Sequence, residues 1–221
     1  MDKEAYFTRL YPLQDEVLRI VNDLKTGFYL TGGTALSRGY LHHRLSDDLD
    51  FFVNDDPRFE LWSGRILHAV GERGKWKMTV LQREERFVRF SLDPGEILLK
   101  VDLVNDVPSH IGQILSHESL GRLDSHENIL ANKITAAIDR REPKDMADIW
   151  GLCLKMNLSL TRAVTDAKSK AAGIFPADLA RTLCSVDRSD WETVRWIDPP
   201  DPDQFLRDVQ HLGEQLLFSE E

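Results

Sequence analysis

Apolar residues near the start of the chain recur at the spacing of one helix face. The repeating positions are Leu10, Leu13, Val17, Ile20, Val21 and Leu24. They predict an amphipathic helix that ends at Gly27. Residues 28–31 are predicted to form a short buried strand, which a Gly-Gly pair stops. Helical spacing returns over residues 34–43, where Thr34 is the predicted N-cap.

The next apolar positions alternate with polar ones. Leu49, Phe51 and Val53 form the apolar set, and Asp48 and Asp50 lie between them. Strict alternation is typical of a strand that turns one face toward a core. We therefore predict a strand here with a polar face that carries two carboxylates.

Further elements follow to the end of the chain. A helix is predicted over residues 59–73, and strands over residues 76–81, 87–92 and 97–104. The strand signals stop after Asp106, and the remaining segments have helical spacing. The predicted helices span residues 127–141, 145–156, 160–171, 177–184 and 204–218. The pattern predicts an α/β part followed by an all-helical part.

The composition is that of an ordinary soluble protein. The chain has 221 residues, of which 42% are hydrophobic and 29% are charged. No stretch reaches the roughly 20 apolar residues that a membrane helix needs, and no apolar signal segment follows the amino-terminus. Its two cysteines have no metal- or disulfide-type spacing. We therefore expect a cytoplasmic protein without a membrane partner.

The formal net charge is −9. A general nucleic-acid coat protein needs a basic face that releases counterions, so this charge argues against that class. It is compatible with an enzyme that has a local basic groove, and Arg140, Arg141 and Lys144 are candidates for one.

Gly32, Gly33 and Thr34 lie between a predicted strand and a predicted helix. Glycines let the backbone turn sharply and approach a ligand, and the N–H groups at a helix start suit phosphate. These residues are also typical of a plain turn, so both interpretations stay open.

Asp48 and Asp50 share one face of their strand because residues i and i+2 point the same way. Adjacent carboxylates repel unless a cation lies between them. Mg²⁺ prefers such hard oxygen ligands together with substrate phosphates. The alternative is a solvated acidic edge.

Lys100 and Asp102 share one face of the last strand. Asp102 would complete a two-metal site with Asp48 and Asp50, in which one ion activates a hydroxyl and the other steadies pyrophosphate. Lys100 would pair with a phosphate or neutralise Asp102, and a structural ion pair is the alternative.

Taken together, these motifs resemble a known family. The residues that carry the resemblance are Gly32-Gly33-Thr34-Ala35-Leu36, His43-Arg44-x-Ser46-x-Asp48-Leu49-Asp50-Phe51-Phe52, Lys100-x-Asp102, Glu127-Asn128-x-x-Ala131-x-Lys133 and Pro143-Lys144-Asp145-x-x-Asp148. They are similar to the AbiEii/AbiGii toxin nucleotidyltransferases, within the polymerase-β-like superfamily. The resemblance implies an α/β (α+β) fold, with a mixed-sheet core over residues 1–115 and a helical domain over residues 116–221.

The resemblance also implies roles for individual residues. The implied catalytic residues are Asp48, Asp50, Asp102, Lys133 and Asp145. The first three would bind Mg²⁺ or Mn²⁺. The implied nucleotide-binding residues are Gly32, Gly33, Thr34, Arg44, Ser46, Lys100 and Arg140. Lys133 and Arg140 are seven apart and share a helix face, whereas helix N-terminal compensation is the alternative for Asp145 and Asp148.

The activity implied by the resemblance is transfer of a nucleoside monophosphate from an NTP to an acceptor hydroxyl. The acceptor would be RNA, such as a tRNA 3′ end, and a cognate antitoxin would be the partner. Two alternatives stay open. The same scaffold serves kinases and enzymes that modify small molecules, and the protein could also bind nucleotide or a partner without turnover.

Overall fold

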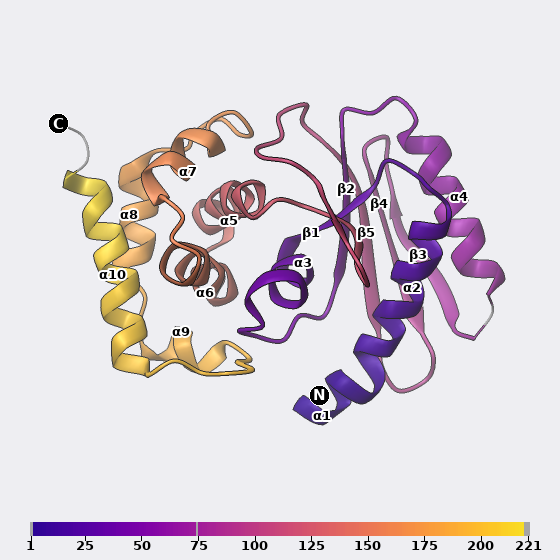
Figure 1. The fold of residues 1–221 in the computed structure, drawn as a ribbon, viewed down its shortest axis with the longest axis horizontal. Helices are drawn as coiled ribbons and strands as arrows, with labels where there is room; N and C mark the ends of the chain where they lie inside the picture. Colours follow the sequence, from indigo (N-terminus) through magenta and orange to yellow (C-terminus); the bar gives the residue numbers. More distant parts are fainter. Residues whose placement is uncertain (1, 74, 219–221) are drawn as a thin grey trace. The chain divides into compact units, whose positions relative to one another are not determined.

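The computed structural model describes residues 2–73 and 75–218 (Figure 1). The chain divides into two compact units, neither of which is one continuous segment. Unit 1 comprises Met1–Gly39, Leu45–Pro108 and Gln113–Asp124. Unit 2 comprises Tyr40–Arg44, Ser109–Gly112 and Ser125–Glu221.

Unit 1 is built on a seven-stranded sheet in the order β3-β4-β5-β2-β1-β7-β6. Its strands are β1 (Tyr29–Thr31), β2 (Leu49–Asn54), β3 (Lys77–Arg83), β4 (Phe87–Asp93), β5 (Leu99–Asp106), β6 (Leu115–His117) and β7 (Gly121–Leu123). β2 runs parallel to β5 and antiparallel to β1, whereas β1 runs parallel to β7. The predicted α/β fold with a mixed sheet is confirmed.

The expectation that strands end at Asp106 is wrong. β6 and β7 form an antiparallel hairpin, and β7 pairs with β1 through Leu123 and Leu30. Each of these strands has three residues, which is too short to show an alternating pattern in the sequence. These strands are stabilised by pairing with their neighbours, and their own sequences carry no strand pattern.

Two helices of unit 1 lie on the apolar face of the sheet. A short helix α1 (Lys3–Ala5) and a π-helical turn (Tyr6–Leu10) lead into α2 (Tyr11–Asp23), and α4 (Phe59–Glu72) follows β2. Figure 1 shows α2 and α4 on the same side of the sheet. Along β2 the apolar set is buried and the intervening side chains are half-buried. The sheet therefore keeps one polar face.

The helix after β1 begins earlier than predicted. α3 spans Gly32–Leu36 with Thr31 at its N-cap position, and a π-helical turn continues it over Ser37–Leu41. The prediction of Thr34 as the N-cap is therefore wrong. Gly32 has φ +69°, so the chain bends at this residue and enters the helix at once.

Unit 2 is helical. Its elements are α5 (His126–Arg140), α6 (Pro143–Trp150), a π-helical turn (Gly151–Lys155), α7 (Leu160–Ala167), α8 (Pro176–Cys184), α9 (Arg188–Thr193) and α10 (Pro202–Phe218). The five predicted helices are present with shifted ends, and α9 was not predicted. A capping box between Asp187 and Asp190 starts this short helix, which has no buried residue to give a periodic pattern.

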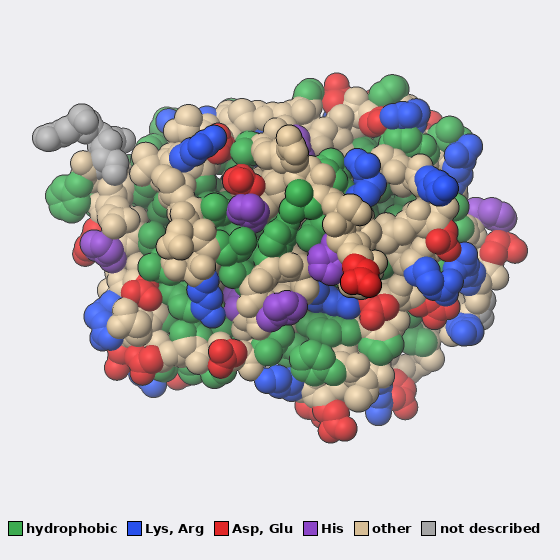
Figure 2. Space-filling view, viewed as in Figure 1, with side chains coloured by type: hydrophobic (Ala, Val, Ile, Leu, Met, Phe, Trp, Pro, Cys, Tyr) green, Lys and Arg blue, Asp and Glu red, His purple; other side chains and the backbone are tan. Residues whose placement is uncertain are grey.

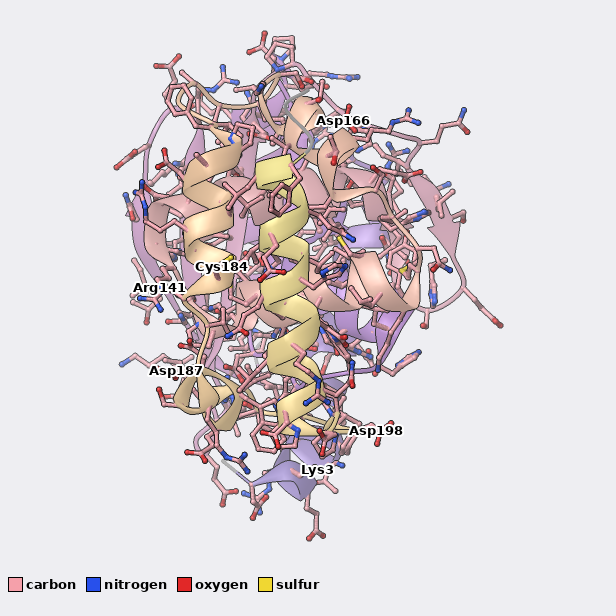
Figure 3. The ribbon with its side chains drawn as sticks, turned by 90° about the vertical axis from the view of Figure 1, so that its left-hand side faces the viewer. Lys3, Arg141, Asp166, Cys184, Asp187 and Asp198 are labelled. Carbon is pink, nitrogen blue, oxygen red and sulfur yellow. The ribbon has the colours of Figure 1, made fainter. Side chains whose placement is uncertain are left out.

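Close packing joins the last helix of unit 2 to α8. Figure 3 shows α10 beside α8, which ends at the labelled Cys184. A Cβ added at Gly213 of α10 would lie 2.7 Å from the Cys184 sulfur. Edge-to-face contacts among Trp150, Trp196 and Phe205 fix the segment before α10.

Helix hydropathy and surface charge are the remaining features of the fold. None of the helices described above has both the length and the apolar character needed to span a bilayer. Acidic and basic side chains are interspersed on the face drawn in Figure 2.

Candidate functional site

The three predicted metal-binding carboxylates come from neighbouring strands of unit 1. Asp50 on β2 lies directly opposite Asp102 on β5. Asp48 is two residues before Asp50 and just precedes β2. Because residues i and i+2 share a face, the backbone places all three carboxylates on the polar face of the sheet.

Two cations hold two of these carboxylates. Arg89 of β4 donates from Nε and Nη2 to the two oxygens of Asp102, at 2.7 and 2.6 Å. Lys100 Nζ lies 3.5 Å from Asp48 Oδ2. Lys100 therefore pairs with Asp48, whereas the sequence suggested Asp102 as its neutralised partner. The hydrogen bond to Asp102 raises the pKa of the Arg89 guanidinium.

Arg89 was not among the site residues predicted from the sequence. The only signal was its position, a charged residue between Val88 and Phe90 in an otherwise apolar strand. A charge on the polar face of a half-buried strand is common, so this signal acquires meaning only when the pairing with Asp102 is known.

The residue types of the site fit a divalent cation. Mg²⁺ and Mn²⁺ prefer carboxylate oxygens, and the backbone brings three carboxylates to one face. Among the residues that the structure describes, no three His, Cys, Asp or Glu side chains are grouped as a metal site. In the structure Asp102 is paired with Arg89 and Asp48 with Lys100. The donors suit the ion, but their side chains must turn to hold it.

The turn after β1 brings the main chain against Asp50. A Cβ added at Gly32 would lie 2.3 Å from Asp50 Oδ2, and the positive φ disfavours other residues as well. Gly32 is therefore required for Asp50 to occupy its place.

Thr34 and Ser46 support the segment that leads into Asp48. Thr34 is buried, and its hydroxyl donates to the Asp48 carbonyl and lies 2.9 Å from the Ser46 hydroxyl. In the structure these hydroxyls position the carboxylate segment. Their predicted contact with nucleotide stays a prediction, as does that of Gly33.

A second group of predicted residues forms a buried ion cluster in unit 2. Lys133 Nζ lies 2.8 Å from Asp145 Oδ1 and 2.7 Å from Asp148 Oδ2. Arg44 donates to both oxygens of Asp148 at 2.7 Å. His43 Nε2 lies 2.9 Å from Asp148 Oδ1. Both aspartates are fully buried.

The contacts in the cluster show which side chains of α5 and α6 face one another. Lys133 and Arg140 both contact Asp145, with Arg140 Nε at 2.9 Å from Asp145 Oδ2, so their shared helix face is confirmed. Glu142 occupies the N-cap position of α6. The two aspartates bind cations from other segments, and this accounts for them better than helix-end compensation does. A phosphate contact of Lys133 stays a prediction.

The charges in the cluster shift the pKa values of its members. Burial alone would raise the pKa of Asp148, but Arg44 and Lys133 hold it well below its usual range. Burial opposes the charge of Lys133, yet Asp148 and Asp145 raise its pKa above the ordinary value. Burial lowers the pKa of His43 more than Asp148 raises it. The cluster is therefore ionised around a neutral imidazole.

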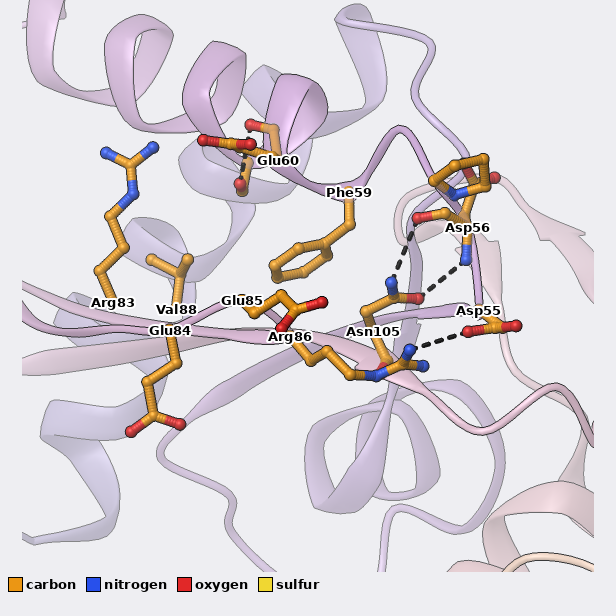
Figure 4. Close-up of a pocket in the computed structure, with 12 residues that line it drawn as sticks. Asp55, Asp56, Phe59, Glu60, Arg83, Glu84, Glu85, Arg86, Val88 and Asn105 are labelled. Atoms are coloured by element: carbon orange, nitrogen blue, oxygen red, sulfur yellow. Dashed lines mark hydrogen bonds and ion pairs between the residues drawn. The ribbon is translucent and has the colours of Figure 1, made fainter.

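A cavity of about 630 Å³ lies elsewhere in unit 1 (Figure 4). It lies between the start of α4 and the β3–β4 turn, and none of the predicted site residues lines it. Within it, Arg86 bonds Asp55 at 2.8 Å, and the Asn105 side-chain amide bonds the main chain of Asp56. Because none of the predicted residues lines this cavity, it is separate from the candidate site.

Comparison with known proteins decides the family. A sequence profile described as the nucleotidyl transferase AbiEii toxin of a type IV toxin–antitoxin system matches residues 17–196. The chain belongs to the AbiEii toxin family. It is a nucleotidyltransferase, and the matched span contains every predicted site residue. No curated protein sequence gives a significant match.

Solved structures share the AbiEii chain's fold. JHP933 from Helicobacter pylori has a TM-score of 0.63 at 18% identity, covering 95% of this chain and 92% of that one. MenT4, a nucleotidyltransferase toxin from Mycobacterium tuberculosis, has a TM-score of 0.57 at 16% identity, covering 94% and 82% of the two chains. At these identities the likeness establishes the fold alone.

Proposed function

We propose that this AbiEii protein moves a nucleoside monophosphate from an NTP to an RNA hydroxyl, such as a tRNA 3′ end. The reaction depends on Mg²⁺ or Mn²⁺, and a cognate antitoxin opposes it in the cytoplasm. The supporting observation is the direct pairing of Asp50 with Asp102 across β2 and β5, with Asp48 on the same face. This arrangement places carboxylates where a divalent ion and phosphates can meet.

The proposed chemistry is an in-line displacement at the α-phosphorus of the NTP. The acceptor oxygen forms a bond to phosphorus, the bond to the β-phosphate oxygen breaks, and pyrophosphate leaves. The hydroxyl proton is released to solvent. A divalent ion held by the three carboxylates would neutralise phosphate charge and make the hydroxyl more nucleophilic.

The chain's own residues mainly position the reactants. Gly32 lets the main chain pass directly beside the Asp50 carboxylate and so helps to fix where that carboxylate lies. Thr34 and Ser46 fix the segment that carries Asp48. We assign Lys100 to a phosphate contact, because its side chain is exposed and can reorient. Orientation of this kind supplies a large share of the rate enhancement in such reactions.

The test is an incubation of the protein with Mg²⁺, each α-labelled NTP and total RNA. The wild type is expected to label RNA and release pyrophosphate. Asp50→Asn should lower the rate at least about 100-fold, since it removes a metal-ligand charge. Asp55→Asn, in the loop at the other end of β2, is the matched control and should keep the rate.

Two outcomes would contradict the proposal. Transfer of γ-label with release of a nucleoside diphosphate would identify a kinase. Equal labelling by Asp50→Asn and the wild type would remove the carboxylates from the mechanism.

A further inference from the structure

The polar face of the sheet continues from the carboxylates toward the free edge at β3. Asp102 on β5 lies opposite Arg89 on β4, which lies opposite Gln82 on β3. In the next row Lys100, Ser91 and Thr79 are partners. Lys100, Gln82 and Thr79 are exposed, as is most of β3. Cationic, hydroxyl and amide groups therefore lead away from the reaction centre.

Aromatic side chains lie beside these rows. Phe87 of β4 pairs with Val104 of β5, which pairs with Phe52 of β2. Both rings are half-buried, and the Arg89 guanidinium lies 5.2 Å from the Phe87 ring centre. Cations interleaved with aromatic rings are the combination that binds single-stranded nucleic acid.

Arg89 is bound to Asp102, which the proposed reaction needs as a ligand of the divalent ion. Its two hydrogen bonds use both oxygens of Asp102. Each oxygen keeps a second lone pair, but the charge of a divalent ion bound to Asp102 would repel the adjacent guanidinium. Binding of the ion through Asp102 therefore favours release of Arg89, whose side chain is already 40% exposed. Lys100 is likewise paired with Asp48, another proposed ligand of the ion.

We propose that Arg89 and Lys100 exchange partners when the site is loaded. Before loading they neutralise Asp102 and Asp48. After loading they bind the phosphate backbone of an acceptor RNA strand that lies along the polar face of β5, β4 and β3. Arg89 is thus a positioning residue that couples ion binding to acceptor binding. The inference rests on the proposed function for the identity of the acceptor.

The coupling makes two binding constants move in opposite directions. In Arg89→Gln the ion no longer competes with a guanidinium, so Mn²⁺ should bind about three- to tenfold more tightly. A short single-stranded RNA with a 3′-deoxy end should bind about tenfold more weakly. The slope of its affinity against salt concentration should fall by about 0.7 for the lost contact.

The proposed exchange also predicts that Mn²⁺ binding and RNA binding strengthen each other. In the wild type, Mn²⁺ should strengthen RNA binding, and by linkage RNA should strengthen Mn²⁺ binding. Arg89→Gln should lose most of this coupling. Arg89→Lys keeps the charge but not the two-pronged geometry, so it should lie between the two proteins.

The matched control is Arg86→Gln on the β3–β4 turn. Arg86 also pairs with an aspartate and has similar exposure, but its partner is Asp55 at the other end of the sheet. Arg86→Gln should leave Mn²⁺ affinity, RNA affinity and their coupling unchanged. Mn²⁺ binding is measured by electron paramagnetic resonance and RNA binding by fluorescence anisotropy.

The results separate this inference from the proposed function. If the wild type labels RNA and Arg89→Gln matches Arg86→Gln in both binding assays, the partner exchange is wrong and the function stands. If the wild type labels no RNA, the function fails, and unchanged Mn²⁺ affinity in Arg89→Gln would then overturn the exchange as well. Displacement of the RNA by polyglutamate at equal charge concentration would point to an acidic protein and overturn the RNA assignment.

Discussion

At the scale of single residues, Lys133 shows how position changes the meaning of a motif residue. The family resemblance assigns it to phosphate, yet its ammonium lies buried between Asp145 and Asp148. Without Lys133, Asp148 would keep Arg44 and Asp145 would keep Arg140, but buried carboxylate oxygens would lose a charged hydrogen-bond donor. Lys133 therefore contributes to the stability of unit 2.

We predict that Lys133→Met lowers the free energy of unfolding by about 1–3 kcal/mol, because two buried carboxylates lose a shared charged donor while Arg44 and Arg140 remain. Urea unfolding measures this. Lys144→Met removes an exposed lysine that pairs with Glu142, and it should change stability by no more than about 0.5 kcal/mol. A stable Lys133→Met protein that no longer binds NTP would instead support the phosphate role.

The sequence predicts which side chains share a face where the residues are close together in one strand. Asp48 and Asp50 are two apart in a strand, so their shared face follows from the backbone alone. Arg44 could not be assigned in the same way, because its partner Asp148 is 104 residues away. Arg89 was missed for the same reason, since its meaning depends on the register between β4 and β5.

At the scale of elements, the β1–α3 turn controls the place of Asp50. We predict that Gly32→Ala lowers stability by more than about 1 kcal/mol, because the residue needs a positive φ. Transfer activity should fall about 100-fold if the added carbon displaces the Asp50 carboxylate. Chemical denaturation and the labelling assay measure the two effects.

The control for this substitution is Gly64→Ala. Gly64 lies inside α4 with no atom within 4 Å of an added Cβ, so alanine should stabilise the helix by about 0.5–1 kcal/mol. Wild-type activity in Gly32→Ala would show that the contact with Asp50 has no part in the reaction.

Long elements were predictable and short ones were not. β2, β5 and the helices of unit 2 carry enough alternating or helical positions to fix their type. β6, β7 and α9 have three, three and six residues. β6 and β7 exist because neighbouring strands pair with them, and α9 begins at a local capping box. The early start of α3 depends on a backbone angle at Gly32 that no side-chain pattern records.

At the scale of the whole molecule, the buried cluster links stability to pH. The pKa of Asp148 is depressed in the folded protein, so its contribution is present above the ordinary aspartate value of 3.8 and is lost as pH falls through the folded value. The pKa of His43 is also lowered, from 6.5. Below 6.5 the unfolded chain takes up this proton before the folded one does, so stability falls there too.

We predict that stability decreases as pH is lowered through the ordinary histidine value, with a slope of up to about 1.4 kcal/mol per pH unit from His43 alone. Unfolding by urea at a series of pH values measures the slope. His43→Gln should flatten it. His211→Gln changes an exposed histidine of the same unit, and it should leave the slope as in the wild type. An equal slope in His43→Gln would exclude His43 as the cause.

The discontinuous make-up of unit 2 has a consequence for synthesis on the ribosome. His43 and Arg44 emerge 105 and 104 residues before Asp148. At about 5–20 residues per second, their partner arrives roughly 5–20 seconds later. During that interval Tyr40–Arg44 lacks the helices that complete unit 2. The ion cluster of unit 2 therefore cannot be complete until the residues up to Asp148 have been synthesised.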